Sequence, residues 1–318
     1  MEPDLRDEVV DFVMHWSAKT ELPQNFFLKD LSLSSQKFCD WKRRYGSINR
    51  HNGHLPRNYW LTDEEQKKII EFYQNNENDG YRRCTYMMID QNIVAASPSA
   101  VYRTLAKAGV LRSKYTQKSL KGTGFQQPSK AHEHWHTDIS YVKINKVFYY
   151  LVCVLDGYSR SIVHWDIRRS MEDQDVHVVQ QAAIEKFPEQ TPRFITDRGS
   201  QFSGREFKGF IKQHGLTHVM TSPYYPQSNG KLERFHYSIK SECIRKKVPF
   251  NLEQAKRVVY EYIRYYNQVR LHSAIGYITP LDKLNGKEKQ IFKLRDQRLE
   301  EARKQRRKIN SYQLKSIC

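Results

Sequence analysis

Residues 135–169 contain three β-type runs separated by short turns: WHTDISYVKI (135–144), VFYYLVCVLD (147–156) and SIVHWDIRR (161–169). The runs are rich in β-branched and aromatic residues, which is typical of strands in a pleated sheet. Asp156-Gly157 is a tight-turn signal, so we interpret Asp156 as a structural residue. The stretch therefore predicts three successive strands.

Helix and strand patterns alternate after these runs. In order they are a helix EDQDVHVVQQAAIEKF (172–187), a strand RFITD (193–197), a helix GREFKGFIKQHG (204–215) and a strand LTHVM (216–220). Three strands followed by alternating helices and strands predict an α/β domain with a mixed five-stranded sheet. We expect this domain to span residues 132–250.

Two small all-α units are predicted upstream, at residues 1–50 and 60–112. In the second unit, Thr62 and Glu65 form a capping-box pattern, and Ser97-Pro98 begins the last helix. The last helix of each unit is short and basic, as in a helix-turn-helix, although an ordinary three-helix scaffold is the alternative. The candidate DNA-binding residues of these helices are Lys42, Arg43, Arg103 and Lys107.

The balance of charge indicates a polyanionic partner. The 318 residues include 53 Lys and Arg against 35 Asp and Glu, a net charge of +18, and nucleic acid is the partner that such an excess favours. A basic linker (113–131) and a C-terminal helical and basic region (251–318) add to it. For the segment LRDQRLEEARKQRRK (294–308) we expect a solvated helix, and nucleic-acid contact is the open alternative.

The cysteines and the absence of long apolar runs indicate the cellular compartment of the protein. The five cysteines form no C-x-x-C pair, which favours a reducing compartment and argues against a cysteine zinc site. No stretch approaches the roughly 18 apolar residues of a membrane span, and MEPDLRDEVV is too polar for a secretory signal. We expect an intracellular protein without a membrane partner.

Three acidic residues are candidates for one site. Asp138 lies within a strand, where aspartate is disfavoured, Asp197 ends a strand, and Glu233 lies in the first turn of a helix after the loop TSPYYPQSNG (221–230). Each has an ordinary structural alternative, namely an edge residue, an Asx-turn and a helix-dipole carboxylate. If the three converged they would repel one another, and divalent Mg²⁺ would remove that repulsion.

Histidines offer weaker candidates. His132, His134 and His136 alternate in HEHWH and could hold Zn²⁺ from one face of a strand, but we interpret them as incidental residues at a strand entry. His236, close to Glu233 in the sequence, could position a water or a phosphate.

Several motifs together resemble a known family. WHTDIS (135–140), FITDRGSQF (194–202) and SPYYPQSNGKLERFHYSIKSE (222–242) resemble the catalytic core of retroviral-integrase-type transposases with an Asp, Asp, Glu triad. The 35 residues between Asp197 and Glu233 match the spacing of that family. YYNQVRLHSAIGYITPLDKL (265–284) is similar to the motif that closes the core in bacterial insertion-sequence transposases.

The resemblance implies an RNase H-like fold and a DNA-cutting and joining enzyme. Asp138, Asp197 and Glu233 would be catalytic and would bind two Mg²⁺ ions, for which Mn²⁺ would substitute. Water would release a 3′-hydroxyl at the element end, and that hydroxyl would attack a second phosphodiester. A metal-dependent nuclease of the same fold, a host-adopted recombinase and a DNA-binding regulator remain alternatives.

The resemblance also implies partners. The candidate contacts to the DNA end are Arg198, Gln227, Asn229 and Lys240. We expect double-stranded DNA, both element terminal repeats and target, and a homo-oligomer that is at least a dimer on DNA. An upstream-encoded fusion partner is an open alternative, and the expected location is the bacterial cytoplasm, associated with the nucleoid when bound to DNA.

Overall fold

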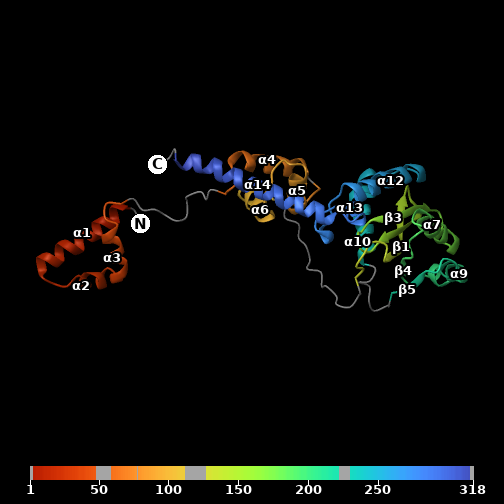
Figure 1. The fold of residues 1–318 in the computed structure, drawn as a ribbon, viewed down its shortest axis with the longest axis horizontal. Coiled ribbons are helices and arrows are strands. Elements are labelled where there is room, and N and C mark those ends of the chain that lie inside the picture. Colours follow the sequence, from red (N-terminus) through yellow and green to blue (C-terminus); the bar gives the residue numbers. More distant parts are fainter. Residues whose placement is uncertain (1–2, 48–58, 77, 112–126, 222–229, 316–318) are drawn as a thin grey trace. The chain divides into compact units, whose positions relative to one another are not determined.

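The computed structural model describes residues 3–47, 59–76, 78–111, 127–221 and 230–315 (Figure 1). The chain divides into two compact units, Met1–Trp60 and Leu61–Cys318. No helix in the described ranges combines the length and apolar character needed to cross a membrane.

The first unit is a bundle of three helices, α1 (Pro3–Thr20), α2 (Gln24–Asp30) and α3 (Ser35–Arg43). Ser34 begins α3 as its N-cap, because its hydroxyl accepts the backbone N–H of Lys37. The buried side chains that hold the bundle together are Val10, Val13, Leu28 and Phe38. Lys42 and Arg43 lie exposed in the last turn of α3.

A second three-helix bundle begins the larger unit, with α4 (Asp63–Asn75), α5 (Tyr81–Asp90) and α6 (Pro98–Lys107). The capping box is present: Glu65 N–H donates to the Thr62 hydroxyl at 3.3 Å, and Thr62 N–H donates to the Glu65 carboxylate at 2.9 Å. The bundle has its own apolar core, formed by Ile69, Tyr73, Cys84, Met88, Val94, Ala96, Val101 and Leu105. Arg103 and Lys107 are exposed on α6.

The catalytic domain predicted from the sequence contains one five-stranded sheet. Its strands are β1 (His134–Ile144), β2 (Val147–Asp156), β3 (Ile162–Arg168), β4 (Arg193–Thr196) and β5 (Thr217–Met220). The order across the sheet is β3-β2-β1-β4-β5, with β1, β2 and β3 antiparallel and with β4 parallel to both β1 and β5. The mixed five-stranded sheet predicted from the sequence is thus confirmed. It could be predicted because alternating apolar runs that end in clear turns leave little freedom in strand register.

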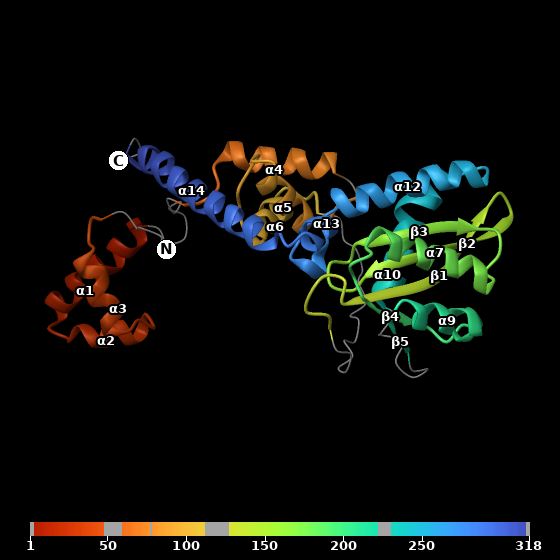
Figure 2. The ribbon, with the colours of Figure 1, turned by 45° about the vertical axis from the view of Figure 1, so that its right-hand side comes forward.

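Helices cover both faces of the sheet (Figure 2). On one face lie α7 (Asp173–Lys186), α8 (Ser200–Ser203) and α9 (Arg205–Gln213). On the other lie α10 (Gly230–Ile239), the π-helix η2 (Lys240–Ile244) and α12 (Leu252–Gln268). The short helix α11 (Arg245–Lys247) follows η2 directly. Each face buries its own apolar cluster, so the domain is a three-layer α/β/α structure.

The buried apolar cluster of the sheet continues beyond residue 250, where the sequence analysis places the end of the domain. Val259 and Ile263 of α12 pack in the same buried cluster as Leu151 of β2 and Ile239 of α10. The tyrosine-rich helix α12 is amphipathic, and its apolar stripe completes the layer that α10 begins. The α/β domain therefore includes α12.

The C-terminal region continues with η3 (Ser273–Ile275), α13 (Pro280–Leu284) and α14 (Glu288–Lys315). The expectation that residues 294–308 form a solvated helix is wrong for one side of α14. Arg295 and Arg306 are 4% and 5% exposed, a burial that arginine reaches only when it is paired. Both contact the second three-helix bundle, and Figure 1 shows α14 running past α4, α5 and α6.

The contacts between α14 and the second three-helix bundle are mainly ion pairs and hydrogen bonds, not apolar packing. Arg306 donates to both carboxylate oxygens of Glu65 at 2.8–3.0 Å and to the Ala95 carbonyl at 2.5 Å. Arg295 forms a bidentate pair with Asp90 at 2.7 and 2.6 Å. Arg298 donates to the Ile89 carbonyl at the end of α5, where a helix dipole favours a cation.

Asp156 plays the structural role assigned to it from the sequence. One carboxylate oxygen accepts the backbone N–H of His132 at 2.8 Å, and the other accepts the N–H and hydroxyl of Ser159 at 2.7 and 2.6 Å. The side chain is fully buried. It ties the start of β1 to the turn after β2.

We expect Asp156→Asn to lower the free energy of unfolding by about 1–3 kcal/mol, because the new NH₂ group cannot accept the buried Ser159 donors. Urea denaturation would measure the loss. Asp296→Asn makes the same chemical change at an exposed position of α14 and should leave the midpoint unchanged. Equal midpoints for the two variants would contradict the structural role.

Candidate active site

Asp138 and Asp197 come together through the register of two parallel strands. His136 of β1 pairs with Ile195 of β4, and each aspartate lies two residues further along its strand direction. Side chains two apart share a face of the sheet. Asp138 also lies opposite Cys153, whose side chain belongs to the cluster under α10 and α12. The two carboxylates therefore stand side by side on the α10 face.

The charge of Asp138 acts on Asp197, as their strand register leads us to expect. Burial raises the pKa of Asp197 above its ordinary value, a hydrogen bond from the Gly199 N–H opposes this, and the charge of Asp138 raises it further. The Gly199 bond, 3.0 Å long, is an Asx-turn, so this structural alternative is also realised. Two adjacent oxygen donors that repel one another suit a hard divalent cation, which would neutralise them.

One face of α10 is turned toward Asp138. The Nδ1 atom of His236 lies 3.5 Å from a carboxylate oxygen of Asp138, and His236 is only 6% exposed. Burial lowers the pKa of Lys240, the charge of Arg245 lowers it further, and the charge of Asp138 raises it. Glu233 lies one turn before His236 on the same face, and its side chain is exposed.

Asp138, Asp197 and Glu233 do not form a metal-holding group in the described residues. In residues 127–221 and 230–315, as in the other described ranges, no three His, Cys, Asp or Glu side chains are grouped closely enough to hold a metal ion. Three ionised carboxylates at close range would repel one another. Gln227 and Asn229 lie outside the described residues, while Arg198 is exposed and donates from Nε to the Thr221 carbonyl at 3.2 Å.

Two anchors that sequence reasoning missed fix α10 and the π-helix η2 that follows it. Lys231 donates to the Gly157 carbonyl at 3.0 Å, and burial lowers its pKa to about 7, with the charge of Arg160 adding to the effect and that of Asp156 opposing it. Beyond Lys240, Glu242 accepts two hydrogen bonds from Arg270 at 2.7 and 3.0 Å. The signal available in the sequence was weak, because burial of a lysine or arginine is not written in a local pattern.

The three histidines of HEHWH do not share a strand face. His132 precedes β1 in a left-handed conformation with φ of 60°, and its ring packs against Phe187. The Nε2 atom of His134 lies 3.9 Å from a carboxylate oxygen of Glu133. In the described ranges, no three His, Cys, Asp or Glu side chains are grouped so that they could hold the zinc ion of the alternative interpretation.

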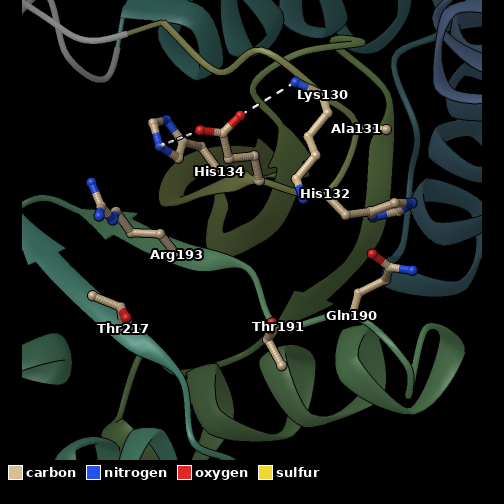
Figure 3. Close-up of a pocket in the computed structure, with 9 residues that line it drawn as sticks. Lys130, Ala131, His132, His134, Gln190, Thr191, Arg193 and Thr217 are labelled. Atoms are coloured by element: carbon tan, nitrogen blue, oxygen red, sulfur yellow. Dashed lines mark hydrogen bonds and ion pairs between the residues drawn. The ribbon is translucent and has the colours of Figure 1, made fainter.

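A cavity of about 300 Å³ lies at the opposite end of β1 and β4 from Asp197 (Figure 3). Lys130, His134 and Arg193 line it together with Glu133. The backbone N–H of Lys130 donates to the Glu133 carboxylate at 3.3 Å. The cavity has mixed charge because Glu133 lines it beside Lys130 and Arg193. It belongs to the entry of the sheet and is separate from the aspartate pair.

Comparisons with known proteins match the part of the chain that contains these residues. The integrase core domain matches residues 128–226, and a second integrase core domain profile matches 214–280. The first range contains both aspartates and the second contains Glu233.

Curated relatives come from bacterial insertion sequences. A protein of insertion element IS476 from Xanthomonas euvesicatoria is 26% identical over 80% of this chain and 73% of its own length. The putative transposase InsK of IS150 from Escherichia coli K12 is 26% identical over 69% of this chain and 82% of its own. Among solved structures, the catalytic core of HTLV-2 integrase in complex with magnesium is 19% identical with a TM-score of 0.41, and covers 48% of this chain and 97% of its own.

A mixed sheet of this order, layered between helices and matched by the integrase core domain, defines an RNase H-like polynucleotidyl transferase. Within that class the chain carries an integrase core domain over residues 128–280 and is similar in sequence to transposases of bacterial insertion sequences.

Proposed function

We propose that this protein cuts the ends of its DNA element and joins them to target DNA in a metal-dependent reaction. The observation that carries the proposal is the aspartate pair on parallel strands, with His236 and Glu233 of α10 and Lys240 at the start of η2 beside it. A nuclease without joining activity would use the same acids, so the reaction products distinguish the two.

Asp138 and Asp197 supply the oxygen donors, and Glu233 completes the set when its helix turns the carboxylate toward them. The residues fit two Mg²⁺ ions, with Mn²⁺ as a substitute, because all the donors are carboxylate oxygens. The bound ions would supply charge stabilisation to the attacking and leaving oxygens of phosphoryl transfer. Lys240 offers a cation beside Asp138 that holds a phosphate of the DNA end.

The chemistry balances without an external energy source. In cleavage a water oxygen forms a bond to phosphorus and gives up a proton, the bond from phosphorus to the 3′-oxygen breaks, and that oxygen takes up a proton to become a 3′-hydroxyl. In joining, the 3′-oxygen forms a bond to a target phosphorus and a target 3′-oxygen leaves with a proton. The second step exchanges one phosphodiester for another, so it needs only positioning and electrostatic stabilisation.

DNA recognition falls to the two three-helix bundles. Lys42 and Arg43 on α3, and Arg103 and Lys107 on α6, are exposed on the last helix of each bundle. Arg198 lies exposed just beyond Asp197, and Gln227 and Asn229 are further candidates for contacts with the DNA end. Because two element ends must be joined, we propose that the chain acts at least as a dimer on DNA, which sedimentation on end DNA would measure.

The test uses labelled DNA from the flanks of the gene, a target plasmid and either Mg²⁺ or EDTA. We expect joined products in Mg²⁺, their loss in EDTA and their return on addition of Mn²⁺. Cleavage without joining would replace the proposal by a nuclease. DNA binding without any chemistry would replace it by a DNA-binding regulator.

A further inference from the structure

We propose that the exposed side of α14 around residues 303–308 is a contact surface for the phosphate backbone of duplex DNA, held beside the second three-helix bundle by Arg306. The inference rests on the proposed function, because it assigns part of the DNA surface of the same protein.

The composition of this segment needs an explanation beyond solvation. Arg303, Lys304, Arg307 and Lys308 surround Arg306, and the sequence between Ala302 and Lys315 holds no aspartate or glutamate. Arg303 with Arg307, and Lys304 with Lys308, are like-charged pairs four residues apart, an arrangement that destabilises an isolated helix. The segment lies about two turns before the end of α14, too far for the helix dipole to favour it.

The four outer side chains are available to a partner. All four are exposed, in contrast to Arg306. Lys304 pairs with Glu300 at 3.0 Å, and both partners are 66% exposed, so this pair is weak. Within the part of the chain that the structure describes, no carboxylate lies within ion-pair distance of Arg303, Arg307 or Lys308.

Arg306 fixes where these charges lie. Its guanidinium bonds Glu65 at the start of α4 and the Ala95 carbonyl, two residues before the N-cap of α6. A helix rises about 1.5 Å per residue, so residues 303–308 lie within about 5 Å of Arg306 along the axis. In a helix-turn-helix the turn and the first residues of the second helix meet the DNA. The basic segment is thus fixed beside the edge of the bundle that would face a duplex.

Guanidinium and ammonium groups at that edge suit phosphate oxygens rather than base edges. Such contacts release counterions, and each contributes about 0.9 to the slope of log affinity against log salt. They strengthen binding to any duplex and carry no sequence information. The surface therefore adds affinity next to α6, whose exposed Arg103 and Lys107 are the candidates for specific contacts.

The test compares two charge-matched variants of the full chain. Arg303→Gln with Arg307→Gln removes two charges beside Arg306, and Lys289→Gln with Lys293→Gln removes two exposed charges nearer the start of α14. Fluorescence anisotropy on a 30-base-pair duplex (about three helical turns) over a range of KCl concentrations gives the salt slope. We expect the first variant to lower the slope by about 2 and the second to leave it unchanged.

Further outcomes keep the inference separate from the proposed function. Arg303→Lys with Arg307→Lys keeps the charges and should keep the slope, which controls for a change in folding. Equal slopes for the two glutamine variants, or a wild-type chain without salt-dependent binding, would overturn the inference. If joining occurs and the slopes are unchanged, the proposed function stands and the inference about α14 fails. If the slope falls and no joining occurs, the inference about α14 stands and the proposed function fails.

Discussion

Asp197→Asn abolishes joined products while the protein stays folded. The substitution removes one of the two paired carboxylates and keeps the shape of the side chain, so we expect the rate of joining to fall on the order of 10³-fold or more. The measurement is the strand-joining assay with labelled end DNA in Mg²⁺. The amide oxygen of the substituted side chain can still accept the Gly199 N–H, so the turn at the end of β4 should persist.

The stability of the same variant gives an independent readout. The fold raises the pKa of Asp197 above its ordinary value of 3.8. The free energy of unfolding therefore falls as the pH rises from 3.8 through the raised pKa, because the carboxylate ionises less readily in the folded state. In metal-free buffer at neutral pH, Asp197→Asn should therefore melt no lower than the wild type. Glu189→Gln, an exposed carboxylate of the same domain, should retain full joining. Equal losses of joining in both variants would remove Asp197 from the site.

Arg306→Ala detaches α14 from the second three-helix bundle. The change leaves the Glu65 carboxylate and the Ala95 carbonyl without their donor in a buried position. Breaking a buried pair costs about 3–5 kcal/mol, and because Glu65 keeps 22% of its side chain exposed we expect about 2–3 kcal/mol here. Hydrogen exchange of the α14 amides should accelerate about 30-fold to 150-fold if exchange follows this opening.

Arg307→Ala is the matched control, because it removes the same side chain from the next position, which is exposed. Its amides should exchange as slowly as those of the wild type. Equal acceleration in the two variants would mean that helix propensity or charge, and not the contact with Glu65, holds α14.

The sheet could be predicted because its signals are local. The runs at 135–144 and 147–156 end at Asn145 and Asp156, which mark turns, and the structure begins or ends each strand within one residue of them. The same holds for the capping box at Thr62 and Glu65, which depends only on residues three apart. The spacing of the three acids could be found in the same way, although their convergence remains a prediction.

Long-range burial could not be predicted. Arginine is usually exposed, so nothing at Arg295 or Arg306 indicates that carboxylates some 200 residues earlier would bury them. The sequence does carry a partial signal: Arg295, Leu299, Ala302 and Arg306 recur at spacings of 3 and 4 on one side of α14. The packing of α12 was missed for a related reason, because its tyrosines mix apolar and polar character.

The way α14 is attached has a consequence for aggregation. In the part of the chain that the structure describes, the apolar core of the second three-helix bundle is closed by residues between Leu61 and Leu111, without any from α14. The contact with α14 consists largely of charged and carbonyl groups, which water solvates well when they separate. Release of the helix would therefore expose polar surface and not an apolar patch of the kind that drives association. We therefore expect that loss of this contact would not by itself promote aggregation.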